Sequence, residues 1–406
     1  MLPYLWVAII AAVVTAAGTF AVLRLSRRFT IAPEIRERDV HTTPTPRLGG
    51  LAMYAGALVA MLAAALFAEF TDVFAESTPR WALLGACTMI VVVGVLDDLF
   101  DLDWMVKLAV QLAVAGLLAW QGAQIVSLPI GDTLIVGSPT VNFVLTVFLI
   151  TLVMNAVNFI DGLDGLVAGV AIIANAAFFV YTQLLIAQTG ADASVTLAAL
   201  IAAVVVGISA GFLPFNWHRA RMFMGDAGAL LIGLLMAVSS ISVTGQLNPA
   251  QLDQELVIAS FIPIILPIAV LALPLADFVL AVARRLRAGK SPFAADRRHL
   301  HHRLLDLGHS PVQAVLIFYL GTAAVSLACL LVFIQQDYVW AAIVVIAGVT
   351  GCAALVVLPA ARVRAAVAQS GLLRWNTAAR RETTPRSADR RGARRAAALE
   401  RTHARD

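Results

Sequence analysis

The feature that most constrains this chain is a series of long apolar runs that recurs from the N-terminus to near residue 360. A membrane-spanning helix needs about 20 predominantly apolar residues. Backbone groups in hydrocarbon must be satisfied within their own segment, so runs of this kind must be helical. Hydrophobic residues make up 60% of the sequence and charged residues 13%, against ~25% charged in a typical soluble domain. A soluble enzyme and a disordered chain are therefore excluded.

The runs predict an all-α membrane bundle of about eleven transmembrane helices. They lie near 3–23, 48–68, 81–96, 108–122, 141–157, 165–187, 193–213, 227–245, 256–280, 311–333 and 338–361. No basic residue precedes the first run, whereas Arg24, Arg27 and Arg28 follow it. A cleavable signal peptide has its charge on the other side. We expect a retained helix with its N-terminus outside.

The basic residues support this orientation, because Lys and Arg concentrate in cytoplasmic loops. With the N-terminus outside, Arg80 is the one basic residue in the outer connections, out of 29 Lys and Arg in the chain. The sequence predicts a multi-pass protein of the bacterial cytoplasmic membrane, with a cytoplasmic C-terminus and five inner loops. We also predict a small hairpin within 123–140, because two short apolar runs flank Gly131 and Asp132.

Residues 1–360 form the predicted membrane domain, and 361–406 form a tail with many Arg and few acidic residues. We expect this tail to be a poorly ordered cytoplasmic extension, either solvated or lying on anionic lipid. The three cysteines lie inside apolar runs without metal-ligand spacing and are interpreted as small apolar residues.

The second inner loop is strongly acidic. Asp97, Asp98, Asp101 and Asp103 fall within seven residues, GVLDDLFDLDW, at the end of a predicted helix. A helix C-terminus already carries partial negative charge, and neighbouring carboxylates make ionisation costlier. The arrangement requires a cation, either Mg²⁺ or Lys107 folding back. The alternative is a solvated acidic turn.

The third inner loop, NAVNFIDGLDGLVAGV, repeats a polar residue at every third position. Asn155, Asn158, Asp161 and Asp164 lie beside glycines that favour a broken helix. Such groups could hold a nucleobase, a ribose or a metal-bound phosphate. Caps on the two flanking helices would explain one or two of them but not all four.

Two other inner loops combine turn residues with polar groups. In HTTPTPRLGG, the X-Pro steps predict extended backbone, and Thr45 is our candidate substrate contact. In PFNWHRARMFMGDAGAL, Asn216 and Arg219 are candidates for substrate and phosphate binding. Asp226 in the same loop is either a helix N-cap or a metal ligand.

The fifth inner loop, near 284–306, is rich in Arg and His. A basic cluster of this kind suits a polyanionic phosphate. The residues that we assign to donor binding are Arg298, His299, His301, His302 and Arg303. Zinc is disfavoured, because neither cysteine nor H-E-x-x-H spacing accompanies them. Because all five loops fall on one membrane face, the layout suits a charged cytosolic donor reacting at the bilayer surface.

At these residues the chain resembles the polyprenyl-phosphate N-acetylhexosamine-1-phosphate transferases. The resemblance spans roughly 25–360 and rests on DD, NxxNxxDGLDGL, N…MGD and HLHH occurring in that order. It implies transfer of a sugar 1-phosphate from a UDP-sugar to a polyprenyl phosphate with Mg²⁺, for which Mn²⁺ can substitute. It implies membrane lipid as a partner, no nucleic acid, and allows a homodimer.

The resemblance also assigns roles to single residues. Those implied to be catalytic are Asp97, Asp98, Asp161 and His301, with Asp97 as a base acting on the lipid phosphate. Those implied to bind Mg²⁺ are Asp226 and Asp98. Those implied to contact substrate are Lys107, Asn158, Asp164, Asn216 and His302.

Two departures favour the branch that contains WecA and TagO, which use UDP-N-acetylglucosamine, over the muramoyl-pentapeptide branch of MraY. Asp101 stands where DDxxK has lysine, and the histidine run is HLHH followed by Arg303. The Arg-rich, Ala-rich composition suggests a GC-rich bacterial source and, on that basis, a decaprenyl acceptor. The alternatives are a muramoyl-pentapeptide phosphotransferase and a secondary transporter. The transporter is disfavoured because its ionisable residues would sit at mid-bilayer.

Overall fold

The computed structural model describes residues 1–29, 45–75, 77–125, 127–130, 133–190, 193–244, 309–335 and 338–357, with isolated positions between 283 and 304. The chain divides into two units, Met1–Leu355 and Val356–Asp406. Nearly all of the second unit lies outside the described residues, as do the predicted span at 256–280 and most of the fifth inner loop. The first unit therefore contains almost all of the described residues.

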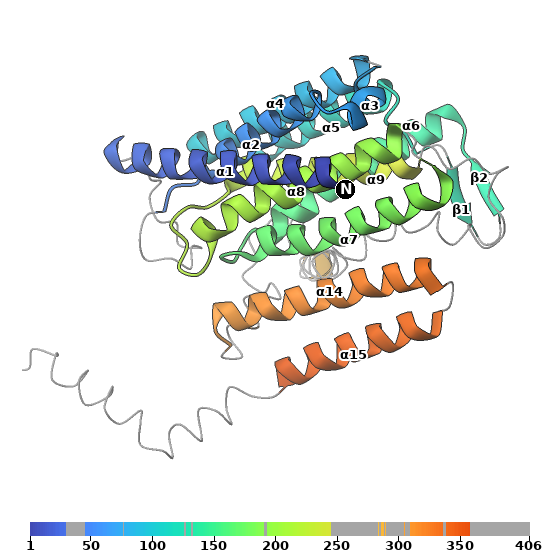
Figure 1. Cartoon of the computed structure of the whole chain (residues 1–406). Helices are drawn as coiled ribbons and strands as arrows, with labels where there is room; N and C mark the ends of the chain where they lie inside the picture. The colour runs from blue at the N-terminus through green and yellow to red at the C-terminus, as the bar shows by residue number, and fades with distance from the viewer. Residues whose placement is uncertain are drawn as a thin grey trace, which may run out of the picture. The chain divides into compact units, whose positions relative to one another are not determined.

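This unit is built from helices and one small hairpin (Figure 1). The helices are α1 (Leu2–Phe29), α2 (Gly49–Ala64), α3 (Thr71–Ala75), α4 (Ser77–Phe100), α5 (Trp104–Trp120), α6 (Pro139–Ile160), α7 (Leu166–Thr189), α8 (Ala193–Asn216), α9 (Gly225–Thr244), α14 (Pro311–Gln335) and α15 (Tyr338–Val357), with a 3-10 turn at Ala68–Phe70. Every predicted apolar run that falls in the described part of the chain coincides with a helix. The prediction of a helical fold is therefore confirmed.

Eight of the described helices are long and apolar enough to cross a membrane. A ninth span results if α2 and the helical turns after it, Ala68–Ala75, count as one element, although they bend by 97°. Helix α5 is apolar but has only 17 residues. The chain is thus a multi-pass membrane protein, whereas the count of about eleven spans and the orientation stay predictions.

The predicted hairpin is present. Strands β1 (Ser127–Ile130) and β2 (Thr133–Val136) pair antiparallel, with Ser127 opposite Val136 and Ile130 opposite Thr133. The register leaves the two predicted turn residues, Gly131 and Asp132, as the connection, although these two lie outside the described residues.

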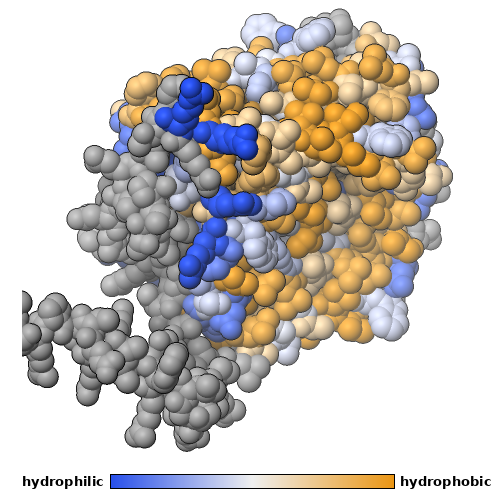
Figure 2. All heavy atoms as spheres, turned by 60° about the vertical axis from the view of Figure 1, so that its left-hand side comes forward, coloured by the Kyte–Doolittle hydropathy of each residue, from blue (hydrophilic) through white to orange (hydrophobic). Residues whose placement is uncertain are grey.

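Helices α8 and α9 form the buried centre of the described bundle, and small residues let their neighbours approach closely. Gly207 and Gly211 of α8 face the α1 backbone, and Gly233 of α9 faces Met154 of α6. The outer helices instead expose large apolar side chains, as expected for lipid-facing surfaces. Figure 2 shows a broad apolar surface on this face, with strongly hydrophilic side chains on one side of it and smaller hydrophilic patches along the opposite edge.

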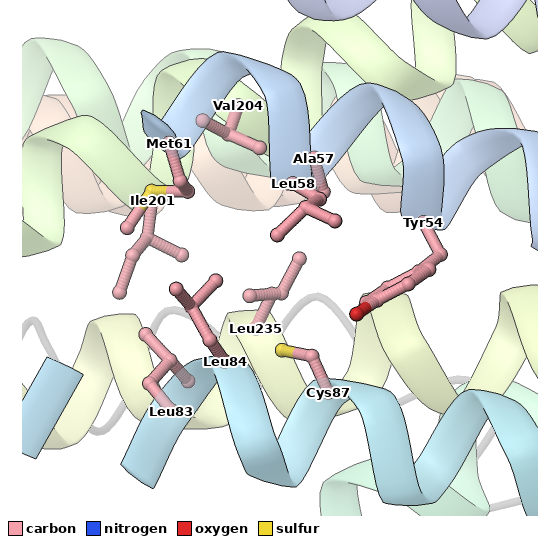
Figure 3. A pocket seen from close by; sticks show the side chains of 10 residues that line it. All are labelled: Tyr54, Ala57, Leu58, Met61, Leu83, Leu84, Cys87, Ile201, Val204 and Leu235. Atoms are coloured by element: carbon pink, nitrogen blue, oxygen red, sulfur yellow. The ribbon is translucent and has the colours of Figure 1, made fainter. Parts of the chain in front are cut away.

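An apolar gap lies between α2, α4, α8 and α9 (Figure 3). Its lining includes Met61, Leu84, Cys87 and Leu235, and the Tyr54 hydroxyl is hydrogen-bonded to Thr88 at 2.6 Å. No charged side chain lines this gap. An apolar lining of this kind does not suit a charged ligand, whereas charged side chains gather at the helix ends.

Candidate active site

The candidate site forms where α4, α5, α6 and α9 bring their ends together. Asp97 and Asp98 lie in the last turn of α4, and Lys107 lies in the first turn of α5. The connection between these helices is short, since α4 ends at Phe100 and α5 begins at Trp104. The Asp103 carboxylate caps α5 by accepting from Met105 N–H at 2.7 Å. Four acidic residues thus mark this junction, but only the first two belong to α4.

Lys107 joins two of the helices through its ammonium group. Its Nζ lies 3.0 Å from Asp97 Oδ2 and 3.1 Å from Asp226 Oδ2, where Asp226 belongs to the first turn of α9. Asn158, near the end of α6, is a further hydrogen-bond partner of Asp226. Lys107 therefore occupies the place of a cation between two carboxylates, as one of the two alternatives from sequence predicted.

Two carboxylates of the site, those of Asp97 and Asp161, are largely removed from water. Asp97 is 7% exposed, and its Oδ1 is buried without a hydrogen-bond donor. Asp161 follows the end of α6. Burial raises the pKa of Asp161 to about 7, and the charges of Asp226 and Asp164 act in the same direction. Positive charge would offset these neighbouring carboxylates, which is a reason to expect a cationic ligand, such as a metal ion, at this place.

The loop after α6 is fastened to the loop after α8. Asn216 accepts from Gly165 N–H at 2.9 Å and donates to Met222 C=O at 3.0 Å, and only 2% of it is exposed. Asp164 accepts from Ala220 N–H at 3.0 Å. Both side chains, predicted as substrate contacts, bond to backbone in this structure. These hydrogen bonds hold the two loops together.

The segment before α2 completes the site from another direction. Phe223 N–H donates to Pro46 C=O at 2.9 Å, Gly49 N–H to Phe223 C=O at 3.0 Å, and Gly50 N–H to Met224 C=O at 2.8 Å. This pairing brings the described part of the predicted HTTPTPRLGG motif, residues 45–50, against the loop that precedes α9. Thr45, in the segment before α2, is buried. Arg219, in the loop between α8 and α9, is exposed.

Three residues of the site were missed by sequence reasoning. The positive charge of Arg47 acts on Asp161, and Arg47 is the one basic residue of its motif, which could have drawn attention to it. Tyr319 of α14 donates from its hydroxyl to Gly165 C=O at 2.5 Å. Gly94 of α4 faces the backbone of Ala227. Nothing in the local sequence distinguishes Tyr319 or Gly94 from other residues of apolar helices.

Of the predicted site residues, the structure brings together Asp97, Asp98, Lys107, Asn158, Asp161, Asp164, Asn216 and Asp226. The five predicted donor-binding residues of the Arg- and His-rich loop lie outside the described residues: Arg298, His299, His301, His302 and Arg303. The described part of the predicted site is thus its acidic part, without the Arg- and His-rich loop.

The fold and this site define a multi-pass membrane protein with a carboxylate-rich cluster at the ends of its helices. Residues 80–244 match the family model for glycosyl transferase family 4. This range contains Asp97, Lys107, Asp161 and Asp226. The match therefore covers the described acidic site.

Comparison with known proteins agrees with the match to this family model. Over 350 residues the chain is 39% identical to the decaprenyl-phosphate N-acetylglucosaminephosphotransferase of Mycobacterium tuberculosis (strain ATCC 25618 / H37Rv), covering 84% of this chain and 87% of that protein. A probable undecaprenyl-phosphate N-acetylglucosaminyl 1-phosphate transferase of Bacillus subtilis (strain 168) is 29% identical over 74% and 76%. The undecaprenyl-phosphate alpha-N-acetylglucosaminyl 1-phosphate transferase of Escherichia coli (strain K12) is 29% identical over 72% and 73%.

The chain belongs to glycosyl transferase family 4, and the resemblance drawn from its motifs is confirmed. It is a membrane-embedded transferase, as its apolar helices and these relatives indicate.

Proposed function

We propose that the protein transfers N-acetylglucosamine 1-phosphate from UDP-N-acetylglucosamine to decaprenyl phosphate and releases UMP. The product would be the first lipid-linked intermediate of a cell-envelope polysaccharide. The observation that carries the proposal is the Lys107 bridge between Asp97 and Asp226 inside the part of the chain that matches the family. The names of the mycobacterial relatives support decaprenyl phosphate as the acceptor and the N-acetylglucosamine donor.

In the proposed reaction, an acceptor phosphate oxygen forms a bond to the β-phosphorus of the donor, and the bond from that phosphorus to the UMP oxygen breaks. Catalysis of phosphoryl transfer depends mainly on positioning and on stabilising charge. A phosphate monoester has its second pKa near ~6, so its attacking oxygen is largely ionised at neutral pH. A general base at Asp97 would contribute little, and we assign Asp97 the task of holding Lys107 in place.

The described residues fit Mg²⁺, although within them no three acidic, His or Cys side chains converge as a complete metal site. Magnesium usually takes only one or two protein carboxylates, with substrate phosphates and water completing its shell. The buried Asp97 Oδ1 without a donor and the neighbouring Asp226 carboxylate are oxygen ligands of that kind. Bound there, the ion would neutralise charge on the diphosphate.

The basic residues of the site would act on the phosphates. Lys107 already lies between two carboxylates, so a phosphate entering near Asp226 would meet its ammonium group. Arg47 is carried into the same region by the pairing of its segment with the loop before α9. The predicted donor-binding loop with His301 and His302 would supply the remaining contacts. These assignments place the reaction at one face of the bundle.

We propose that this face is cytoplasmic, in the bacterial cytoplasmic membrane, with about eleven spans and the N-terminus outside. The distribution of basic residues supports this topology, since Arg80 is the one basic residue in the proposed outer connections. The predicted inner loops must all lie on one side of the bundle. In agreement with this, the ends of α4, α6 and α8 lie beside the beginning of α9.

The test is a transfer assay with the detergent-purified full-length protein, decaprenyl phosphate, Mg²⁺ and radiolabelled UDP-N-acetylglucosamine. We expect equal amounts of UMP and of labelled, butanol-extractable lipid. Chelation with EDTA should abolish both, and Mg²⁺ or Mn²⁺ should restore them. Asp226→Ala should form neither product while remaining folded, as judged by its elution and thermal unfolding.

Parallel reactions separate the alternatives. Labelled lipid formed only from the UDP-muramoyl-pentapeptide donor would replace the proposed donor with that of the muramoyl branch. Undecaprenyl phosphate accepted in preference to decaprenyl phosphate would correct the acceptor. No product from either donor would reject both proposed donors and point to another UDP-sugar.

A further inference from the structure

The first turn of α9 is capped by a side chain from another helix. Asp226 N–H donates to Asp98 Oδ1 at 3.1 Å, and Ala227 N–H donates to Asp98 Oδ2 at 3.4 Å. The first N–H groups of a helix have no partner within it and are usually satisfied by a Ser, Thr, Asp or Asn at the N-cap. Here Met224 and Gly225 precede Asp226, and neither offers a side-chain oxygen.

Asp98 can approach the beginning of α9 closely because a glycine stands there. Gly225 has φ +67°, and a Cβ on it would lie 2.2 Å from Asp98 Oδ2 and 2.3 Å from Arg47 C=O. Gly94 lies one turn before Asp98 on the same face of α4 and contacts the Ala227 backbone. The same face of α4 thus meets the beginning of α9 at two successive turns.

The neighbouring carboxylates Asp97 and Asp98 therefore face different partners. Asp97 pairs with Lys107 and keeps one buried oxygen without a donor, whereas both oxygens of Asp98 accept from backbone N–H groups. A carboxylate at a helix N-terminus is also favoured by the helix dipole. Asp98 is consequently placed to fix a piece of backbone, and that backbone carries Asp226.

We propose that Asp98 is a positioning residue: its carboxylate anchors the first turn of α9 so that Asp226 stays beside Lys107 and Asp97. This assigns the two adjacent aspartates separate tasks, in place of the shared catalytic and metal-binding roles that the resemblance implies. The link to catalysis rests on the proposed function, whereas the anchoring itself does not.

The anchoring is tested by hydrogen–deuterium exchange of the full-length protein in detergent, comparing Asp98→Asn with Asp97→Asn. Asparagine at 98 keeps one acceptor oxygen and turns an NH₂ group towards the other N–H. We expect exchange in peptides that cover the first turn of α9 to accelerate by about 10-fold or more, since one of the two backbone N–H groups loses its acceptor. Asp97→Asn, which changes the neighbouring charge equally, should leave these peptides unchanged.

A second variant disturbs the same contact from the other side. In Gly225→Ala the new methyl group would displace the Asp98 carboxylate and the Arg47 carbonyl without removing any polar side chain. We expect the same accelerated exchange at α9. If Asp98→Asn does not fold, Gly225→Ala carries the test. If both fold, the double variant should exchange no faster than the faster single variant, because both changes break one contact.

The consequence for the site is tested by the Mg²⁺ concentration that half-activates transfer. Displacing Asp226 should raise it by about 10- to 100-fold, as loss of outer-shell partners does at metal sites. A residue with a merely structural role would lower the amount of active protein and leave this concentration unchanged.

Unchanged exchange at α9 in a folded Asp98→Asn protein that has lost activity would overturn the proposal and make Asp98 a direct ligand of substrate or metal. Acceleration spread over all helices would overturn it as well, because it would report general destabilisation. Should the wild-type protein transfer no sugar phosphate, the proposed function would fail while the exchange comparison still decides the anchoring.

Discussion

Replacing Gly94 by alanine tests how closely α4 must approach α9. A Cβ at position 94 would lie 2.3 Å from Ala227 Cα and 2.4 Å from Ala227 N. Non-bonded carbon atoms attract best at about 3.5–4.0 Å, so the two helices would have to separate by about 1 Å. Both atoms belong to backbone, and no flexible side chain can move aside to relieve the contact.

The magnitude follows from this displacement. Overpacking of a tight contact costs about 1–3 kcal/mol, whereas Gly→Ala within a helix recovers about 1 kcal/mol of helix propensity. We therefore expect a modest loss of stability, about 0–2 kcal/mol. Asp226 would move with the beginning of α9, and a misplacement of about 1 Å can lower a rate by about 10²-fold.

Gly85→Ala is the matched control, because it lies on the same helix and a Cβ there would meet nothing within 4 Å. The assay is kcat/KM for labelled lipid formation, together with thermal unfolding of each variant in detergent. We expect Gly94→Ala to lose about 10²-fold in kcat/KM and Gly85→Ala to stay near wild type. A folded Gly94→Ala protein within threefold of wild-type activity would refute the reasoning.

Three further predictions follow from single side chains. Lys107→Gln leaves Asp97 and Asp226 facing each other without a cation, and we expect kcat to fall by about 10²–10³-fold, whereas a near-normal kcat would exclude a role for the ammonium group. Asn216→Ala leaves two buried backbone groups unpartnered, so unfolding in detergent should become easier by about 2 kcal/mol or more; an unchanged melting temperature would contradict the loop-fastening role. Tyr319→Phe removes one hydrogen bond to the same loop and should lower stability by about 1 kcal/mol and kcat/KM by less than 10-fold in the transfer assay; an effect as large as that of Lys107→Gln would show that the hydroxyl acts on substrate.

The sequence located the helices well, because the membrane requirement is local. A run of about 20 apolar residues forms a helix whatever its neighbours are. For the same reason the polar positions at helix ends, from Asp97 to Asp226, were recognisable as candidate site residues. The two-residue turn of the hairpin was also predictable, since turn chemistry depends on adjacent residues. The sharp bend after α2 was not foreseen, and its apolar residues give no local sign of it.

The role of each side chain within the site was decided by tertiary structure. Asp97 and Asp98 are identical and adjacent in sequence, yet one faces Lys107 and the other faces the beginning of α9, because successive residues of a helix point in different directions. Tyr319 and Gly94 matter through contacts with residues far away in the chain. The sequence by itself determined a membrane-helical transferase with carboxylates at one face. Only the packing of separate helices decided which carboxylate meets a cation and which holds backbone, because these contacts join segments that no local pattern connects.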